Sequence, residues 1–205
     1  MKIYKIFLIL GICSLSFACQ QNITSSVEIN MPPIRERVNN LVSEALKWDG
    51  SAYLYSVTVP VSEDASAWKL TAAFNSPSKP YNSLILELST AGKIETIILD
   101  IPTQVSQRKP ILDKDWPIDS DKAINNFIMQ EPYVMDFLMS NKRHCSDMKL
   151  ERFSTDTTNR PVVWSLSLFD CISKSEYYYL NPITGEMLNL SHSIVPDSVL
   201  ISPSP

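Results

Sequence analysis

Two stretches of the chain carry apolar residues at the spacing of an amphipathic helix. The first contains Ile34, Val38, Leu41, Val42, Ala45 and Leu46. The second contains Ala123, Ile124, Phe127 and Ile128, and it follows Asp119 and Ser120, two residue types that cap helix N-termini. Because residues three and four positions apart share one helix face, each stretch predicts a helix. Glu131-Pro132 is predicted to end the second helix, and a short helical segment to restart through Val134, Phe137 and Leu138.

After each helix the apolar residues recur at every second position, which is the pattern of half-buried strands. The strands predicted after the first helix cover residues 53–59, 68–74, 84–88 and 94–101, and those after the second cover 148–150, 162–168, 177–180 and 187–190. Gly92 and Gly185 each lie between the last two strands of their set. The order of helix, strands and glycine turn thus occurs twice, which indicates an internal repeat.

These patterns predict an α+β protein of two tandem modules, each a helix packed on a small antiparallel β-sheet. The modules are expected near residues 34–101 and 112–190. Residues 19–33 are mostly polar and end in two prolines, which is typical of a flexible tether. Residues 191–205, rich in serine and proline, are predicted to form a loose C-terminal tail.

The N-terminus has the organisation of a secretory leader. Lys2 and Lys5 precede an uncharged apolar run that ends at Leu15, and small residues stand shortly before Cys19. Residues 1–18 are therefore predicted to be a signal peptide, because the apolar run is too short to favour an uncleaved membrane anchor. The stretch resembles a bacterial lipoprotein leader, in which the cysteine after the cut receives a lipid such as palmitate. Ordinary secretion with Cys19 left as a free thiol is the alternative.

The charge of the chain limits its partners. Removing the leader removes two lysines, which takes the formal net charge from −4 to −6. No basic patch is expected, which argues against nucleic-acid binding and against docking on anionic lipid by charge alone. The lipid on Cys19 would instead hold the protein in the cell envelope, facing the periplasm or the exterior. In a Gram-negative source, the outer membrane is the expected location.

The cysteines predict one disulfide. Cys13 leaves with the leader and Cys19 is assigned to the lipid. Cys145 and Cys171 are then an even pair in an oxidising compartment, which favours a bond between them.

A strand register gives a second argument for this disulfide. We predict that residues 148–153 pair antiparallel with residues 162–169, with Leu150 opposite Leu166 and Met148 opposite Leu168. That register places Cys145 opposite Cys171, within the distance that a disulfide can bridge.

Motifs for catalysis or metal binding are scarce. His144 precedes Cys145, but with His192 as the only other histidine no zinc-ligand spacing is present. A catalytic cysteine–histidine pair lacks support for the same reason. The chain has four glycines and no Gly-x-Ser-x-Gly, which argues against a serine hydrolase and a phosphate-binding loop. We therefore expect no metal and no cofactor.

A cluster of acids is the remaining candidate for chemistry. Its members are Asp113, Asp115, Asp119 and Asp121. Acidic residues favour helix N-termini and solvated loops, so a structural role is the primary interpretation of this cluster. A hydrolase that uses these carboxylates remains an alternative.

The aromatic residues divide into core and surface candidates. Trp68 and Trp164 occupy matching positions in the two halves and are predicted to lie in the core. The run Tyr177, Tyr178 and Tyr179 must alternate between the two faces of a strand, so at least one tyrosine should be exposed. An exposed aromatic strand face is a candidate surface for binding a partner.

The second half resembles a PepSY-type domain. The resemblance is carried by Pro161-Val162-Val163-Trp164, by the run from Tyr178 to Met187 with its Thr184-Gly185-Glu186 turn, and by Ala123 in the helix. The Trp116-to-Ser120 segment is similar to the boundary between two such modules in tandem, while the first half matches loosely. Asn181 stands where the family usually has aspartate. The resemblance implies a helix on a small antiparallel sheet and a binding or inhibitory role in the envelope, often beside peptidases.

The function predicted from these observations is that of a non-enzymatic, membrane-anchored envelope lipoprotein. It is expected to bind a protein or peptide partner and so to modulate a peptidase. The alternatives are a structural or assembly factor of the envelope without a small ligand, and the carboxylate hydrolase named above.

Overall fold

The computed structural model describes residue 29 and residues 31–61, 68–101, 109–140, 145–153, 161–169 and 175–189. The leader, Cys19, His144, Cys171 and the C-terminal tail lie outside the described residues. What the sequence predicts for them therefore stays a prediction.

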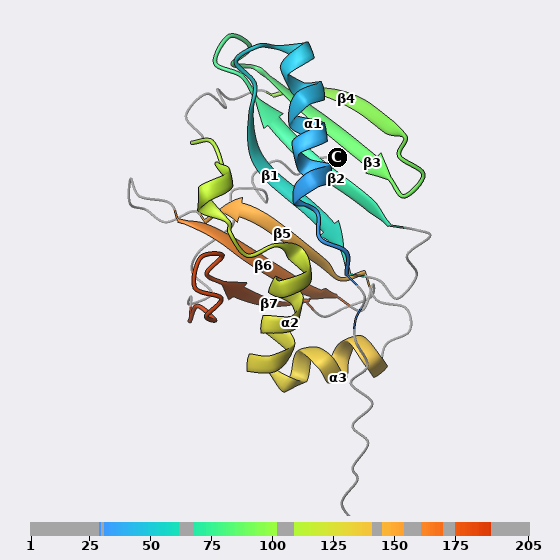
Figure 1. Cartoon of the computed structure of the whole chain (residues 1–205), viewed down its shortest axis with the longest axis vertical. Helices are drawn as coiled ribbons and strands as arrows, with labels where there is room; N and C mark the ends of the chain where they lie inside the picture. The colour runs from blue at the N-terminus through green and yellow to red at the C-terminus, as the bar shows by residue number, and fades with distance from the viewer. Residues whose placement is uncertain are drawn as a thin grey trace, which may run out of the picture.

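The described residues form an α+β fold with one seven-stranded antiparallel sheet, in the order β4-β3-β2-β1-β5-β6-β7 (Figure 1). The strands are β1 (Tyr53–Pro60), β2 (Lys69–Asn75), β3 (Asn82–Ser89), β4 (Ile94–Asp100), β5 (Asp147–Arg152), β6 (Val162–Phe169) and β7 (Ser175–Leu180). β1 pairs with β2 on one side and with β5 on the other. The two predicted modules thus contribute to one continuous sheet that joins them at β1 and β5.

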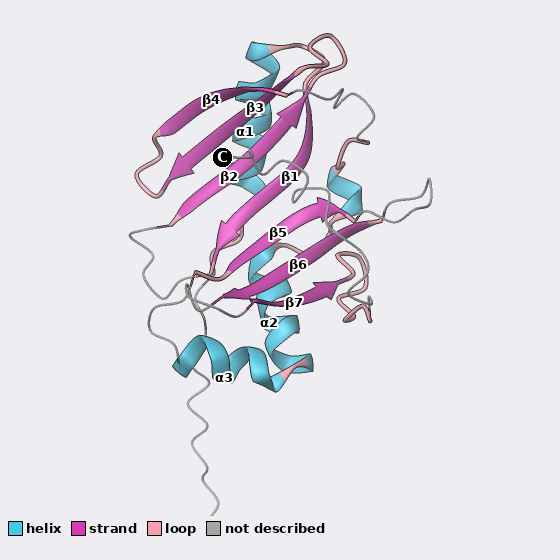
Figure 2. Ribbon diagram, turned by 180° about the vertical axis from the view of Figure 1, so that it is seen from behind, coloured by secondary structure: helices cyan, strands magenta, loops and turns pink. Residues whose placement is uncertain are grey.

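Three helices lie against one face of this sheet, as the front and back views show together (Figures 1 and 2). They are α1 (Arg35–Trp48), α2 (Ser120–Gln130) and α3 (Pro132–Ser140). α1 packs on β1, β2 and β3, α2 on β7, and α3 on β6. No helix in the described part of the chain has the length and apolarity needed to cross a membrane.

The hydrophobic core lies between the helices and the sheet. α1 buries Val38, Leu41 and Ala45, which share one face because of their spacing. Trp68 and Trp164 are both buried, as predicted. The Trp164 ring meets Trp116 edge-on at 6.2 Å between ring centroids. Its indole N–H donates to the backbone oxygen of Ile118 (2.9 Å), so the core tryptophan also fixes the entry into α2.

One carboxylate joins the two halves at the helix N-termini. Asp119 Oδ1 accepts from the backbone N–H groups of Ile34 (3.0 Å) and Ser120 (2.7 Å), and Oδ2 accepts from that of Arg35 (3.1 Å). Asp119 therefore caps α2, as predicted, and also the start of α1, about 85 residues away in the sequence. The positive ends of both helix dipoles converge on this side chain.

The predicted register between β5 and β6 is wrong by two residues. Met148 lies opposite Leu166, Leu150 lies opposite Trp164, and the Cys145 N–H donates to Phe169 O (2.8 Å). A two-residue shift keeps each side chain on the same face of the sheet, so apolar alternation cannot distinguish the two registers. The register argument for the disulfide does not hold, because Cys145 is opposite Phe169.

The fourth predicted strand of the second half is also absent from the described residues. Residues 187–189 make only an isolated bridge, between Met187 and Leu180, followed by a hydrogen bond from Leu188 N–H to Tyr179 O (2.8 Å). Within the second half, α3 lies between α2 and β5, and it has no counterpart among the described residues of the first half.

Candidate partner-binding surface

The edge strand β4 carries the most unusual surface among the described residues. β4 is the last strand of the sheet, and no described strand pairs with its outer edge. All seven of its residues are exposed, including Ile94 (36%), Ile97 (43%), Ile98 (55%) and Leu99 (38%). A soluble protein seldom leaves several large aliphatic side chains together on an unpaired strand, because such an edge is prone to pairing with another chain.

The helix layer ends before it reaches β4, which explains this exposure. α1 packs on β1, β2 and β3. Leu84 and Leu88 of β3 are buried on the helix face, whereas their β4 neighbours, Ile98 and Ile94, are exposed. In the back view β4 likewise forms the border of the sheet (Figure 2).

The backbone of β4 presents donors and acceptors along this border that no described strand pairs with. Ile101 N–H donates to Tyr81 O (2.7 Å) and Ser89 N–H donates to Lys93 O (3.0 Å), so the odd-numbered residues bond inward to β3. In an antiparallel pair, alternate residues point their backbone groups away from the partner. The N–H and C=O groups of Thr96 and Ile98 therefore point out from the sheet.

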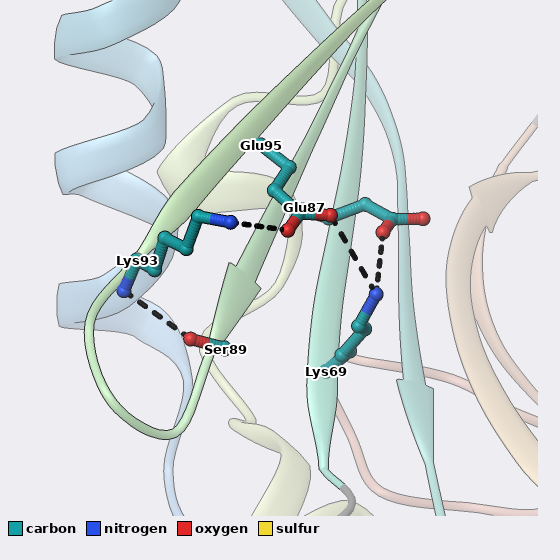
Figure 3. Close-up of polar contacts among 5 residues, drawn as sticks. All are labelled: Lys69, Glu87, Ser89, Lys93 and Glu95. Atoms are coloured by element: carbon teal, nitrogen blue, oxygen red, sulfur yellow. Dashed lines mark hydrogen bonds and ion pairs between the residues drawn. The ribbon is translucent and has the colours of Figure 1, made fainter.

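Four charged side chains form a network beside this edge, on the face away from the helices (Figure 3). Lys69 Nζ lies 3.1 Å from Glu87 Oε2 and 3.8 Å from Glu95 Oε2, and Lys93 Nζ lies 2.9 Å from Glu95 Oε1. The hydrogen bond from Lys93, with the charges of Lys93 and Lys69, lowers the pKa of Glu95. The hydrogen bond and charge of Glu87, followed by the charge of Glu95, raise the pKa of Lys69.

The network divides the β4 surface into two parts. Glu95, near the N-terminal end of β4, pairs with Lys93, which directly precedes the strand, and with Lys69 of β2. The segment from Ile97 to Leu99 carries no charge. Charged side chains on an edge strand limit indiscriminate pairing, so the network leaves Ile97 to Leu99, between Glu95 and Asp100, as the accessible apolar segment.

The three tyrosines predicted to bind a partner lie at the opposite edge of the sheet, in β7, and have three different environments. Tyr177 is exposed (46%). Tyr179 is buried against Phe153, 4.7 Å between ring centroids. The Tyr178 hydroxyl donates to Glu176 Oε2 (2.9 Å); burial, and then this hydrogen bond, raises the pKa of Tyr178. At least one tyrosine of the run is therefore exposed, and partner binding by Tyr177, Tyr178 and Tyr179 stays a prediction.

Two of the four clustered acids have clear structural partners. Asp119 caps two helices, as described above. Asp115 Oδ2 lies 3.2 Å from Arg152 Nη2 and accepts from the N–H of Leu112 (3.0 Å). These contacts agree with the structural interpretation of the cluster. Asp113 belongs to the same single 3₁₀ turn as Asp115, and Asp121 lies in the first turn of α2.

The predicted cysteine and metal sites are only partly within the described residues. Cys145 lies within the described residues but Cys171 does not, so the disulfide between them stays a prediction. Among the described residues, no three histidine, cysteine or acidic side chains lie close enough together to hold a metal ion.

The turn that carries the family resemblance is held by α2. Asn181 Oδ1 accepts from the N–H groups of Ile183 (2.9 Å) and Thr184 (3.3 Å). An aspartate oxygen could accept the same bonds, so the asparagine preserves the turn. The Gln130 side chain of α2 donates to Gly185 O (2.7 Å) and accepts from Met187 N–H (2.9 Å). These two bonds hold the backbone after the turn against α2.

The exposed edge was not predicted from the sequence. Residues 97–99 are three consecutive apolar positions, which place apolar side chains on both faces of a strand. Such a run usually indicates a strand buried on both faces. Only the order of the strands shows that this one is an edge.

Comparisons with known proteins add a fold relative. No protein family model matches the chain, and no curated protein matches it. The chain is similar to the crystal structure of CD1622 from Clostridium difficile 630, a protein assigned as a lipoprotein, with a TM-score of 0.52 and 8% sequence identity. The match covers 82% of this chain and 97% of the other. At this identity the likeness concerns the fold alone.

Proposed function

We propose that the protein is a membrane-anchored lipoprotein of the cell envelope that binds a protein partner through the edge strand β4. The observation that carries the proposal is the combination of exposed Ile97, Ile98 and Leu99 with outward-pointing backbone groups on the same strand. Strand addition uses these two features: main-chain hydrogen bonds provide affinity, and side chains provide selectivity.

The envelope location is supported by two separate observations. The predicted leader ends directly before Cys19, where a lipid would be attached. The fold is shared with CD1622, which is itself assigned as a lipoprotein. Ile29 and Met31 already pack on the core, so the shorter polar segment between Cys19 and Ile29 would let the folded part stand roughly 15 Å from the membrane, with β4 free to meet a partner.

We further propose that the two halves are PepSY-like modules. Each half contributes a helix and an antiparallel meander, and Gly92 and Gly185 adopt the same left-handed conformation (φ 78°) at the matching turn. The first strands of the halves, β1 and β5, pair with each other. In that arrangement β4 is the outer edge of the first module, and modulation of a peptidase would be one use of its binding surface.

A position-specific cross-link in intact cells tests the binding proposal. A photo-reactive amino acid is placed at Ile98 in the full-length chain, and at Ile183 as a matched control. Both positions are exposed isoleucines (55% and 61%), but Ile183 follows β7 at the opposite edge. We expect a discrete protein adduct from position 98 and none from position 183. Equal adducts from both positions, or none from position 98, would contradict the proposal.

A further inference from the structure

We propose that the partner seated on β4 is a second copy of this chain, paired antiparallel through β4 about a two-fold axis at Ile98. The inference rests on the proposed role of β4 as a binding edge and names its occupant. This pairing would join the seven-stranded sheets of the two copies into one continuous sheet.

The backbone of β4 suits this pairing. Antiparallel partners exchange both hydrogen bonds between residues whose N–H and C=O groups point at each other. Thr96 and Ile98 have outward-pointing groups. Two copies of Ile98 can therefore exchange two hydrogen bonds at the axis. Thr96 can exchange two more with Asp100 of the second copy, on each side of the axis.

The side chains of β4 are self-complementary about Ile98. In the order Thr96-Ile97-Ile98-Leu99-Asp100, three apolar residues lie between two polar ones, so the pattern reads the same in both directions. Pairing about Ile98 places Ile97 opposite Leu99 on one face and Ile98 opposite itself on the other. Thr96, a hydroxyl donor, then lies opposite the Asp100 carboxylate.

Neighbouring registers lack this match. Pairing about Ile97 places Leu99 opposite Glu95 and Ile94 opposite Asp100. Each of these two pairs occurs twice because of the two-fold axis, so an aliphatic side chain faces a carboxylate four times. Pairing about Thr96 places Ile97 opposite Glu95. Cross-strand pairs of like polarity stabilise a sheet, so the register about Ile98 is favoured over both alternatives.

Charge and symmetry are also compatible with self-pairing. Among the residues of β4, the register about Ile98 opposes no aliphatic side chain to a carboxylate and no two like charges; Glu95 lies opposite Ile101, which follows the strand and is buried. A two-fold axis that pairs two edge strands is perpendicular to the sheet, so both helix layers lie on the same side. Two chains anchored in one membrane can therefore pair without inverting either of them.

Charge substitutions at the axis give a direct test on the full-length mature chain in detergent. Ile98→Lys sets two ammonium groups opposite each other, and Ile98→Glu sets two carboxylates opposite each other. Sedimentation equilibrium should show self-association of the wild type, at least tenfold weaker self-association of each variant alone, and recovery of dimer when the two variants are mixed. Ile183→Lys is the control and should associate like the wild type.

Two outcomes would overturn the inference. Wild-type protein that stays monomeric up to the concentration it reaches in the membrane would exclude the second copy, while a position-98 adduct of another protein would still support β4 binding. A dimer unaffected by both Ile98 substitutions would place self-association elsewhere on the molecule. Matching circular dichroism spectra of the variants and wild type would show that the strand change leaves the fold intact.

The register is tested by disulfide formation between copies. Ile98→Cys places two thiols at directly opposed positions about 5.5 Å apart at Cα, within disulfide range. Ile97→Cys leaves its thiols two residues out of register. We expect covalent dimer from position 98 and at least tenfold less from position 97, with the wild type as background. The reverse result would overturn the register about Ile98.

Discussion

Single side chains connect parts of this molecule that are distant in sequence. Asp119 caps α2 and also bonds the backbone at the start of α1. Arg35, in turn, donates to the Trp116 oxygen and stacks its guanidinium on the Trp116 ring at 4.7 Å. The first half is thereby tied to the segment that begins the second half. The N-cap role of Asp119 could be predicted from the sequence, but its bonds to Ile34 and Arg35 depend on tertiary structure.

Gly185 is required by both its conformation and its surroundings. Its φ is 78°, and a Cβ there would lie 2.5 Å from Asn126 Nδ2 and 3.0 Å from Ile118 Cδ1. Gly92 has the same φ, but nothing lies within 4 Å of its Cβ position. Alanine at either position should therefore lower the free energy of unfolding by about 1–2 kcal/mol, because alanine disfavours the left-handed conformation. Gly185→Ala should lower it further, because its Cβ would clash with Asn126 and Ile118.

Urea unfolding of the two alanine variants measures this difference. We expect Gly185→Ala to have the lower free energy of unfolding, and Asn126→Ala to restore part of the loss in the double variant. Equal losses at Gly92 and Gly185 would show that the contact with Asn126 is relaxed at little cost.

At the level of strands and loops, Asp49 ties together two loops at one end of the sheet. Its Oδ1 accepts from Ser51 N–H (2.8 Å) and Ser51 Oγ (2.6 Å), and Oδ2 accepts from Ser78 Oγ. The hydrogen bonds from Ser51 and Ser78 lower the pKa of Asp49 well below its usual range. The ionised carboxylate therefore stabilises the folded state.

This lowered pKa gives a stability dependence on acid. The contribution of Asp49 is present above its ordinary pKa of about 4 and is lost as the pH falls below that value. Asp49→Asn should show a smaller fall in Tm between pH 5 and pH 3 than the wild type, and Ser78→Ala should show an intermediate fall. Parallel Tm curves for Asp49→Asn and wild type would exclude Asp49 as a contributor to acid sensitivity.

Proline substitutions in β4 test which of its backbone groups face outward. Proline is tolerated on an edge strand where the lost N–H pointed to solvent. Ile98→Pro should therefore cost at least about 1 kcal/mol less than Ile97→Pro, whose N–H bonds to β3, given the usual net value of a hydrogen bond. Chemical unfolding of the two monomeric variants provides the comparison. A larger loss of unfolding free energy for Ile98→Pro would mean that the N–H of Ile98, and not that of Ile97, bonds to β3.

The sequence predicted where each strand lies along the chain better than it predicted which strands pair with each other. Alternation predicted the seven strands of the sheet to within a few residues, because the pleat fixes which residues face the core. It could not predict that β1 pairs with β5, or that Met148 lies opposite Leu166, because these depend on long-range packing. The exposed edge depends on the same information, so a strand that was predicted correctly gave no sign of its exposure.

At the scale of the whole molecule, the proposed lipid anchor at Cys19 would hold near the membrane a sheet whose β4 edge is not paired by any described strand. Cys19→Ala should move the chain from the membrane fraction to the soluble envelope fraction and remove the lipid mass from the mature N-terminus. A lipid anchor of two or more acyl chains holds a protein stably, so the shift should be nearly complete. Unchanged fractionation and unchanged mass would contradict the lipid assignment.

The most direct test of the account measures whether β4 is covered in the living cell. Ile98→Cys and Ile183→Cys are labelled with a small maleimide in intact cells and again as dilute purified protein. The two positions have similar exposure in the structure and should react at similar rates when dilute. In cells, we expect position 98 to react at least fivefold more slowly than position 183, because a partner strand covers it. Equal rates in cells would contradict the claim that β4 is a partner-binding edge.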